Sequence, residues 1–356
     1  MQRLLFIDRD GTILREPDDE QIDSISKFRF VDGVLRMLPL ICERTDYIPL
    51  LVSNQDGLGT SSFPEPDFEH LQRLMLDTLR SVGVTFKDIF IDCSLPSQKL
   101  PTHKPGIEML AMYTNDTYDL AHSYAIGDRA TDEQLAQSLG CGFIRISQDD
   151  PDSWHRAADT LIHGERRATL HRKTLETDVN IDLNLNGTGQ SDIHTGIGFF
   201  DHMLIQIARH AAVDLSLTAH GDLQVDCHHT IEDVAITLGQ ALNQALVDRR
   251  AIERYAFILP MDDSCAQVSI DLGGRADLLW DVTFSRDEVG NIPTEMWKHF
   301  FKSLSRDAHM NIQIRAQGED NHHLVESVFK AFARCLRSAI RRDLLSDRLP
   351  SSKGVL

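Results

Sequence analysis

Two stretches of the sequence carry the same arrangement of side chains that can bind metal ions. Residues 226–233 read Asp-Cys-His-His-Thr-Ile-Glu-Asp, and residues 321–327 read Asn-His-His-Leu-Val-Glu-Ser. A single histidine precedes each pair at a similar distance, His202 in the first case and His299 in the second. Two matched sets in one part of the chain predict a duplicated unit that holds a pair of ions.

The spacing within each set suits metal coordination. On a helix, residues three or four apart share a face, so Glu232 can align with either His228 or His229. Imidazole and carboxylate groups together suit divalent ions such as manganese, iron and zinc. Three histidines and one glutamate per ion leave positions open for a substrate, which is typical of a catalytic site. The alternative, histidines that only pack in a core or lie on exposed helices, is improbable for two matched sets. The predicted ligands are His202, His228, His229, Glu232, His299, His322, His323 and Glu326.

A second group of reactive side chains lies at the start of the chain. Asp8 and Asp10 come at the end of the first apolar run, and Gly11 lets the chain turn tightly after them. In open α/β sheets, ligands bind outside the carboxyl ends of the strands. One carboxylate of such a pair can attack phosphorus while the other donates a proton to the leaving oxygen.

Later segments supply further groups of the same kind. Ser53 follows Leu-Leu-Val, Lys104 stands in His-Lys-Pro-Gly, and Asp128 follows Tyr-Ala-Ile-Gly. Taken alone, the Asp8–Asp10 pair is equally compatible with a calcium-binding or polar turn. The ordered set of two carboxylates, a hydroxyl, an ammonium and a further acid favours a magnesium-assisted phosphoryl-transfer site.

The elements that must position these residues differ between the two parts of the chain. Apolar runs alternate with amphipathic helices in the first part, which predicts a parallel sheet covered on both faces. The expected strands are Leu4–Asp8, Tyr47–Ser53, Asp88–Cys93, Ser123–Gly127 and Gly142–Ile146, with helices such as Phe68–Ser81 and Asp132–Leu139. In the second part, the alternation over Thr177–Leu185 predicts a half-buried strand. Long helices are expected at Ile197–Arg209, Thr230–Asp248, Trp297–Arg306 and Leu324–Arg342.

These patterns predict two domains. Residues 1–164 are expected to form an α/β domain, and residues 165–356 an α+β domain with an internal duplication. The acidic, turn-forming segment 147–165 is expected to be the junction between them.

Composition narrows the class of protein. The formal net charge of -18 argues against a nucleic-acid partner, because phosphate backbones require basic surfaces. The six scattered cysteines form no Cys-x-x-Cys motif and fit a reducing cytoplasm. No apolar stretch approaches the ~20 residues of a membrane span, and the first residues are typical of a strand, not a signal peptide.

The motifs of the first part resemble the haloacid-dehalogenase superfamily of phosphatases. This resemblance implies a Rossmann-like parallel sheet, with Asp8 as nucleophile and Asp10 as acid/base. Ser53 and Lys104 would bind the phosphate group. Magnesium would be bound by Asp8, the backbone carbonyl of Asp10 and Asp128, and Asp132 would support the site.

One segment departs from related histidinol phosphatases, which carry a zinc loop before the Lys-Pro motif. Here Cys93 stands at a ligand position and His103 is a weak second candidate. A structural zinc requires four ligands, so no structural zinc is expected.

The second part resembles imidazoleglycerol-phosphate dehydratase from about residue 167 to the C-terminus. The resemblance rests on the two His-His-x-x-Glu motifs, on Gly196–Leu204 and on the tail Pro350–Leu356. It implies two manganese ions per site and Glu176 as an acid/base carboxylate, which would otherwise be read as an exposed strand glutamate. Gln313 stands where this family commonly has histidine. The implied phosphate-binding residues, which would otherwise be ordinary surface residues, are Arg254, Arg275, Ser351 and Lys353.

The whole chain resembles the bifunctional histidinol-phosphatase/imidazoleglycerol-phosphate dehydratases of bacteria. The resemblance implies small phosphorylated imidazole substrates and a large symmetric homo-oligomer, assembled through the second part, in which metal sites form between subunits. One alternative keeps the dehydratase and makes the first part a phosphatase for another small phosphate ester. A second alternative is a metal-binding scaffold without activity, which the complete set of reactive residues disfavours.

Overall fold

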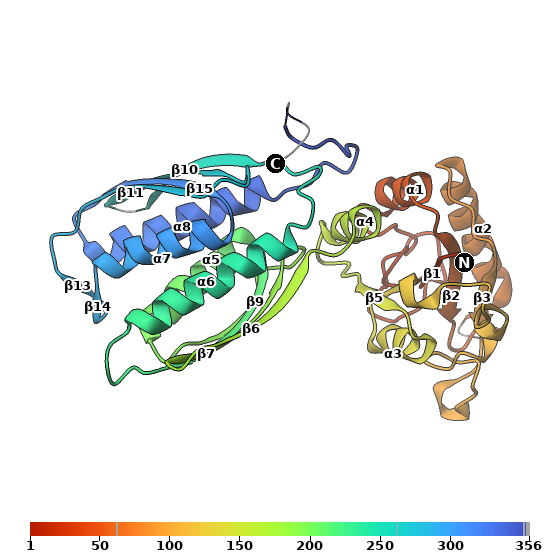
Figure 1. The fold of residues 1–356 in the computed structure, drawn as a ribbon. Coiled ribbons are helices and arrows are strands. Elements are labelled where there is room, and N and C mark those ends of the chain that lie inside the picture. The colour runs from red at the N-terminus through yellow and green to blue at the C-terminus, as the bar shows by residue number, and fades with distance from the viewer. Residues whose placement is uncertain (62, 262, 352, 354–356) are drawn as a thin grey trace. The chain divides into compact units, whose positions relative to one another are not determined.

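The computed structural model describes residues 1–61, 63–261, 263–351 and 353. It divides into two compact units, Met1–Gly164 and Glu165–Leu356 (Figure 1). The last residues of the tail motif, 354–356, and residue 352 lie outside the described residues. No helix in the described ranges is long and apolar enough to cross a membrane.

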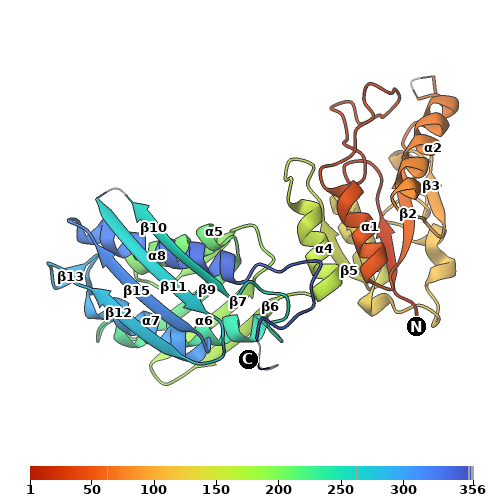
Figure 2. The same ribbon diagram turned by 90° about the horizontal axis from the view of Figure 1, so that it is seen from above.

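The first unit is built on a parallel sheet of five strands in the order β3-β2-β1-β4-β5 (Figure 2). Each neighbouring pair of strands is parallel, which confirms the predicted parallel sheet. The strands are β1 (Leu4–Ile7), β2 (Ile48–Asn54), β3 (Ile89–Asp92), β4 (Tyr124–Gly127) and β5 (Gly142–Arg145). The helices are α1 (Val34–Arg44), α2 (Glu65–Ser81), α3 (Ala130–Leu139) and α4 (Ser153–His163), with short 3-10 turns at Pro96–Gln98, Glu108–Tyr113 and Leu120–His122.

The expected junction at residues 147–165 contains a helix that its turn-forming residues did not indicate, α4. Trp154 of this helix is fully buried, and its Nε1 donates a hydrogen bond to the Thr12 carbonyl oxygen at 2.9 Å. Ala157, Ala158 and Leu161 complete a buried apolar face. Helical periodicity therefore outweighs the turn-forming residues at the start of the segment, and α4 belongs to the first unit.

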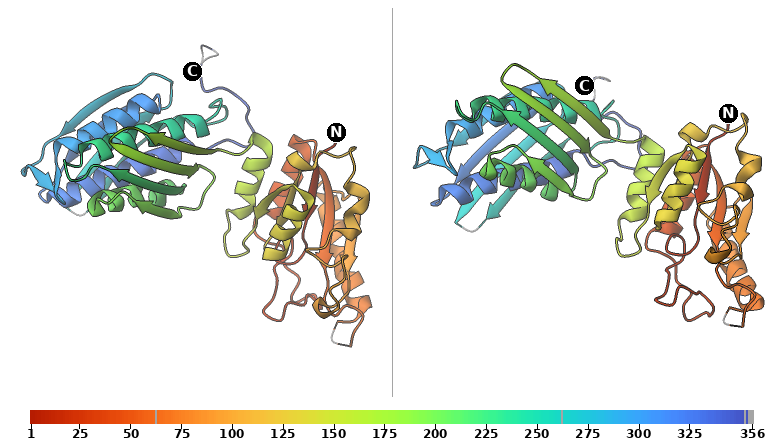
Figure 3. Two further views of the ribbon diagram at one scale, coloured as in Figure 1. Left: turned by 60° about the horizontal axis from the view of Figure 1, so that its bottom comes forward. Right: turned by 90° about the horizontal axis from the view of Figure 1, so that it is seen from below.

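The second unit contains the same arrangement twice. Its two four-stranded sheets have the orders β6-β7-β9-β8 and β10-β11-β15-β12, and four helices lie between them (Figures 1 and 3). In each sheet the first two pairings are antiparallel and the last is parallel. The first repeat comprises β6 (Arg167–Lys173), β7 (Thr177–Asn184), β8 (Ser191–His194), α5 (Gly198–Ala211), β9 (Asp214–Gly221) and α6 (His228–Ala245). The second comprises β10 (Tyr255–Met261), β11 (Ser264–Asp271), β12 (Asp277–Val282), α7 (Glu295–Asp307), β15 (Asn311–Gln317) and α8 (Asn321–Ala339), with a small β13 (Glu288–Val289) and β14 (Ile292–Pro293) hairpin.

Two of the long helices end earlier than the sequence pattern predicts. Helix α6 ends at Ala245 and not at Asp248, because Val247 adopts a left-handed φ of 50° that interrupts the helix. Helix α8 ends at Ala339 and not at Arg342, which instead forms a β-bridge with Ile252.

The core of the second unit joins the two repeats. Phe200 of α5 packs edge-on against Phe300 of α7 with ring centroids 5.5 Å apart, and Phe300 lies 5.3 Å from Phe329 of α8. All three rings are fully buried. Because the helices of one repeat cover those of the other, residues distant in the sequence are brought onto shared helix surfaces.

Candidate active sites

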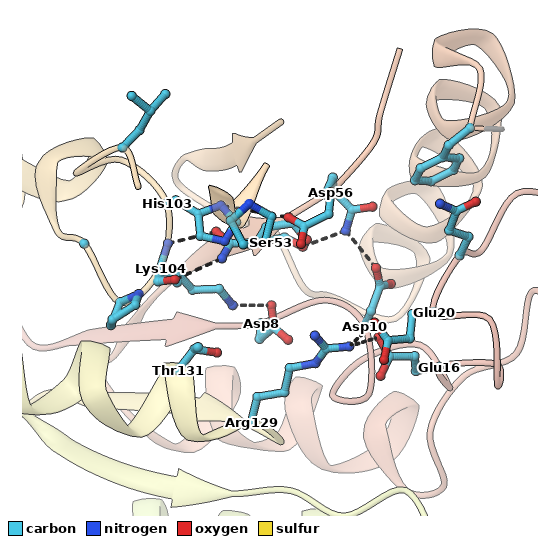
Figure 4. A pocket seen from close by; sticks show the side chains of 18 of the residues that line it. Asp8, Asp10, Glu16, Glu20, Ser53, Asp56, His103, Lys104, Arg129 and Thr131 are labelled. Atoms are coloured by element: carbon cyan, nitrogen blue, oxygen red, sulfur yellow. Dashed lines mark hydrogen bonds and ion pairs between the residues drawn. The ribbon is translucent and has the colours of Figure 1, made fainter. Parts of the chain in front are cut away.

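The first unit gathers its reactive side chains at the carboxyl ends of its strands. Asp8 follows β1, Ser53 lies near the end of β2, and Lys104 reaches the same place from a loop (Figure 4). These residues and Asp10 line a cavity of about 610 Å³. The structure therefore brings together four residues that the sequence placed in one phosphoryl-transfer site.

Lys104 is the centre of a buried charge network. Its Nζ lies 2.6 Å from Asp8 Oδ1 and 2.7 Å from Asp132 Oδ1, and all three residues are buried. Burial alone would lower the pKa of Lys104, but the two carboxylates outweigh it and raise that pKa. Burial also raises the pKa of Asp8 above its ordinary value. The lysine is thus held cationic where an anion can be bound.

Three carboxylates are arranged to hold a cation. Oxygens of Asp8, Asp128 and Asp132 lie within 4.8 Å of one another, and Asp128 Oδ1 is buried without a hydrogen-bond partner among the described residues. Burial, together with the Asp132 carboxylate, raises the pKa of Asp128 to about 6. A Cβ atom added at Gly11, whose φ is +74°, would lie 2.2 Å from Asp128 Oδ2, so the turn must be glycine. An oxygen ligand set with an unpaired buried oxygen fits a magnesium ion.

Asp10 is held by residues that the sequence did not single out. Its Oδ1 lies 2.5 Å from Arg9 Nη1, and its Oδ2 accepts a hydrogen bond from Gln55 Nε2 at 2.7 Å. Gln55 Nε2 also lies 2.8 Å from Ser53 Oγ, and the fully buried Arg9 donates through Nε to Gln72 of α2 at 2.9 Å. Gln55 directly follows Ser53 and Asn54 at the end of a predicted strand. That position next to a candidate phosphate-binding residue could have identified Gln55 from the sequence.

Cys93 and His103, the two candidate zinc ligands, differ in their surroundings. Cys93 is exposed, whereas His103 Nδ1 lies 3.3 Å from Asp92 Oδ1. The same Asp92 oxygen accepts a hydrogen bond from the backbone N–H of Ser94 at 2.8 Å. Hydrogen bonds therefore connect the two ends of this loop around Asp92.

The candidate ligands of the second unit form two clusters, and each cluster joins the two repeats. His202 of α5 lies with His322 and Glu326 of α8, and His299 of α7 lies with the corresponding residues of α6. His202 Nε2 is 3.6 Å from Glu326 Oε1, and His322 Nε2 is 3.7 Å from Glu326 Oε2. The lone histidine of each repeat therefore completes the cluster of the other repeat.

The second cluster is built from the corresponding residue types, two histidines and a glutamate. His299 Nε2 lies 3.2 Å from Glu232 Oε1, and His228 Nε2 lies 3.9 Å from Glu232 Oε2. His299 Nε2 is buried and makes no hydrogen bond in the described part of the chain. Two imidazoles and a carboxylate, with a buried nitrogen lacking a hydrogen bond, fit a divalent transition metal.

The second histidine of each pair, His229 or His323, is absent from these two clusters. His229 Nδ1 lies 3.0 Å from Asp222 Oδ2, and the carboxylate raises the pKa of His229. His323 Nδ1 lies 2.7 Å from Asp263 Oδ1. In each imidazole Nδ1 contacts a carboxylate, and such a contact commonly orients a histidine that binds a metal through its other nitrogen.

Glu176 lies in the turn of the β6–β7 hairpin and is exposed. It is one of the charges that raise the pKa of His229, after the hydrogen bond that His229 donates to Asp222. The structure thus places the predicted acid/base near the histidine pair at the start of α6.

The predicted phosphate-binding residues lie at the other end of the unit. The backbone N–H of Arg254 donates to the carbonyl of Ala339, the last residue of α8, at 2.8 Å. Its Nη1 donates to the Pro350 carbonyl at 2.8 Å, which places the tail with Ser351 and Lys353 beside it. Arg275 is exposed in the segment after β11.

Gln313 lies away from the metal clusters within this chain. On β15 it alternates with the buried Ile312 and Ile314 and is exposed on the opposite face of the strand. Since the buried face packs on the helices, Gln313 points away from the helix layer that carries both clusters.

Comparisons with known proteins agree with this two-part organisation. A family model described as imidazoleglycerol-phosphate dehydratase matches residues 195–336. The histidine biosynthesis bifunctional protein HisB of Bacteroides fragilis is 49% identical over 372 residues, with 100% of both chains covered. The imidazoleglycerol-phosphate dehydratase structure from Staphylococcus aureus has 32% identity and a TM-score of 0.46, covering 50% of this chain and 99% of that one. The D,D-heptose 1,7-bisphosphate phosphatase of B. bronchiseptica has 25% identity and a TM-score of 0.36, covering 40% and 79% of the two chains.

The protein belongs to a class of bifunctional enzymes of histidine biosynthesis. Its similarity to relatives extends over their full length. The chain belongs to the family of bifunctional HisB proteins of histidine biosynthesis.

Proposed function

We propose that the first unit, residues 1–164, is a magnesium-dependent phosphatase that hydrolyses histidinol phosphate to histidinol. The observation that carries this proposal is the set of Asp8, Asp10, Ser53 and Lys104 around one cavity. Asp8 attacks the phosphorus and forms an aspartyl-phosphate while Asp10 protonates the leaving histidinol oxygen. Asp10 then takes a proton from the water that hydrolyses this intermediate.

The remaining groups of this site bind the phosphate. The Lys104 ammonium and the Ser53 hydroxyl contact its oxygens. Magnesium held by Asp8, the Asp10 carbonyl and Asp128 would neutralise charge on the transferring group. Because Gln55 contacts both Asp10 and Ser53, it keeps the acid/base beside the phosphate-binding hydroxyl.

The charge of the cavity supports a substrate that carries a cation beside its phosphate. Six carboxylates line it, compared with the three cations Lys99, Lys104 and Arg129. Arg129 is itself occupied, with Nη2 2.6 Å from Glu16 Oε1. Histidinol phosphate carries an ammonium group, which such an acidic lining attracts.

The second unit, residues 165–356, dehydrates imidazoleglycerol phosphate to imidazole acetol phosphate. Two manganese ions bound by the histidine–glutamate clusters would favour the imidazolate form of the substrate ring and delocalise developing charge. Glu176 moves the proton that must leave an unactivated carbon next to that ring. Arg254, Arg275, Ser351 and Lys353 bind the phosphate group.

The geometry of one chain supports a dehydratase site that is shared between copies. Arg254 lies at the C-terminal end of α8, whereas His322 lies at its N-terminal end. At ~1.5 Å per residue, roughly 25 Å of helix separate them, and a three-carbon side chain cannot span that distance. We therefore propose a symmetric homo-oligomer in which His229 and His323 complete metal sites of neighbouring copies.

A substrate comparison tests the phosphatase proposal. Hydrolysis of histidinol phosphate should exceed that of a phosphate ester of similar size whose alcohol part carries no positive charge. Asp8→Asn should abolish hydrolysis of histidinol phosphate while dehydration continues. Equal hydrolysis of both esters would favour a phosphatase for another small phosphate ester. Loss of both activities in Asp8→Asn would contradict independent sites.

A metal titration tests the dehydratase proposal. After removal of bound metal, dehydration of imidazoleglycerol phosphate should return as manganese is added and saturate near two ions per chain. No activity at any metal loading would contradict this assignment.

A further inference from the structure

Asp233 is a buried carboxylate that the proposed mechanism does not use. It directly follows the candidate ligand Glu232 on α6, and 7% of its surface is exposed. Its carboxylate faces the β6–β7 hairpin and not the metal cluster, because its hydrogen-bond donors come from that hairpin. A buried charge is retained at low cost only when it is paired and hydrogen-bonded, and Asp233 is both.

The contacts of Asp233 hold both strands of the hairpin. Asp233 Oδ1 lies 3.0 Å from Arg172 Nε and 2.9 Å from Arg172 Nη2, on β6. Asp233 Oδ2 accepts a short hydrogen bond from the Thr177 hydroxyl, at the start of β7, and a longer one from Thr174 Oγ1 at 3.5 Å. The hairpin is therefore fastened to the helix that carries His228 and Glu232.

Thr174 connects this anchor to Glu176. Its Oγ1 accepts hydrogen bonds from the backbone N–H of Glu176 at 3.1 Å and of Thr177 at 3.0 Å. The Thr174 N–H in turn donates to the Thr177 carbonyl at 2.9 Å. The backbone that carries the Glu176 carboxylate is thus fixed two hydrogen bonds away from Asp233.

The corresponding position of the second repeat holds a serine and not a carboxylate. Ser327 follows Glu326 as Asp233 follows Glu232, and its hydroxyl donates within its own helix to the Leu324 carbonyl at 2.8 Å. In that repeat the hairpin carboxylate is Asp263, which contacts His323 directly. Among the described residues, the contacts of Asp233 belong to the repeat whose hairpin carries Glu176.

We infer that Asp233 is a positioning residue, which fixes the Glu176 hairpin relative to the metal-binding helix α6. This inference rests on the proposed dehydratase function. Since a reacting group displaced by about 1 Å can lose ~100-fold in rate, an anchor of this kind affects turnover without touching the substrate.

The test is a double-mutant cycle measured on the manganese-loaded full-length protein. Asp233→Ala should lower the kcat of dehydration about 10- to 100-fold while KM, manganese content and phosphatase activity stay unchanged. In a Glu176→Gln background the same substitution should cause no further loss, because Asp233 acts through Glu176. Asp233→Asn, which keeps an acceptor for Thr177 or Arg172, should lose less than Asp233→Ala.

Two further variants separate positioning from folding. Thr174→Ala removes the hydrogen bonds of Thr174 Oγ1 to the Glu176 and Thr177 backbone but keeps Asp233 and its contacts with Arg172 and Thr177, and it should lower kcat in the same direction. Asp178→Ala removes a carboxylate of the same hairpin that pairs with Lys173 and His171, and it should leave kcat unchanged. Equal losses from Asp233→Ala with and without Glu176, or loss of manganese, would overturn the inference. An inactive wild-type dehydratase would instead overturn the proposed function.

Discussion

His299 Nε2 lies 3.2 Å from Glu232 Oε1, although the two residues belong to different repeats of the second unit. His202 and Glu326 form the reciprocal pair at 3.6 Å. Each candidate metal cluster is therefore made by both repeats, so neither repeat can hold an ion with its own clustered residues alone. Duplication of the fold and completion of the metal sites are linked by the packing of α5 on α8 and of α6 on α7.

Removing one lone histidine should therefore affect the cluster of the other repeat. In His202→Ala the ion held by His322 and Glu326 should be lost, or bound at least 10-fold more weakly, while the ion held by α6 remains. Metal analysis after dialysis should give about one manganese ion per chain in place of two. His194→Ala, an exposed histidine paired with Asp192, is the control and should keep both ions. Loss of both ions from His202→Ala would argue against separate clusters.

Lys104→Met should abolish phosphatase activity and destabilise the first unit. The substitution leaves Asp8 and Asp132 buried without their cation, and breaking a buried ion pair in this way costs about 3–5 kcal/mol. Thermal unfolding should show an earlier transition for this unit, and dehydration should continue at the wild-type rate. The exposed Lys99→Met serves as the comparison for stability. An unchanged unfolding temperature in Lys104→Met would contradict the pairing.

The pKa of Asp128 predicts a pH-dependent stability in the metal-free protein. Folding raises this pKa from its ordinary value of 3.8 to about 6, because the carboxyl group is buried near Asp132. The folded state then binds more protons than the unfolded state. The contribution of the Asp128 carboxyl to the free energy of unfolding is therefore complete below about pH 4 and is lost as the pH rises through about 6. Metal-free Asp128→Asn should consequently be more stable than wild type at pH 7.5 and no more stable at pH 4.

Magnesium should reverse this trend in the wild-type protein. The ion binds the ionised carboxylates, so it should raise the unfolding temperature of the first unit more at pH 7.5 than at pH 5. Denaturation scans with and without magnesium at both pH values measure this. A gain that is equal at the two pH values would argue against Asp128 as a ligand.

Mixed assemblies should reveal whether dehydratase sites are shared between copies. Arg254→Ala and His202→Ala should each be inactive alone in dehydration. Co-assembly of the two variants should restore up to about a quarter of the sites, because some sites then combine an intact Arg254 from one copy with an intact His202 from another. Co-assembly of His202→Ala with His322→Ala, whose residues share one cluster, should restore none. Absence of recovery in the first mixture, with assembly confirmed by sedimentation, would contradict a shared site.

The sequence determined the reactive residues because their spacing follows local geometry. Residues four apart on a helix share a face, which places His228 next to Glu232. The order of acid, hydroxyl and lysine along the first part of the chain predicted the phosphoryl-transfer site of the first unit. The pattern also predicted the parallel sheet, since alternating buried strands and helices have few other solutions. It did not indicate helix α4 within residues 147–165, because turn formers at the start of this segment precede the apolar face of the helix.

The tertiary structure decided which of these residues meet. His202 is nearer in sequence to His228 than to His322, yet it joins His322 because α5 packs on α8. The anchoring of the Glu176 hairpin likewise joins Thr177 and Asp233, which lie 56 positions apart in segments that share no common periodicity. Such contacts depend on how the helices and sheets pack against one another. This packing is determined by side chains throughout the buried core, so no local spacing of residues predicts it.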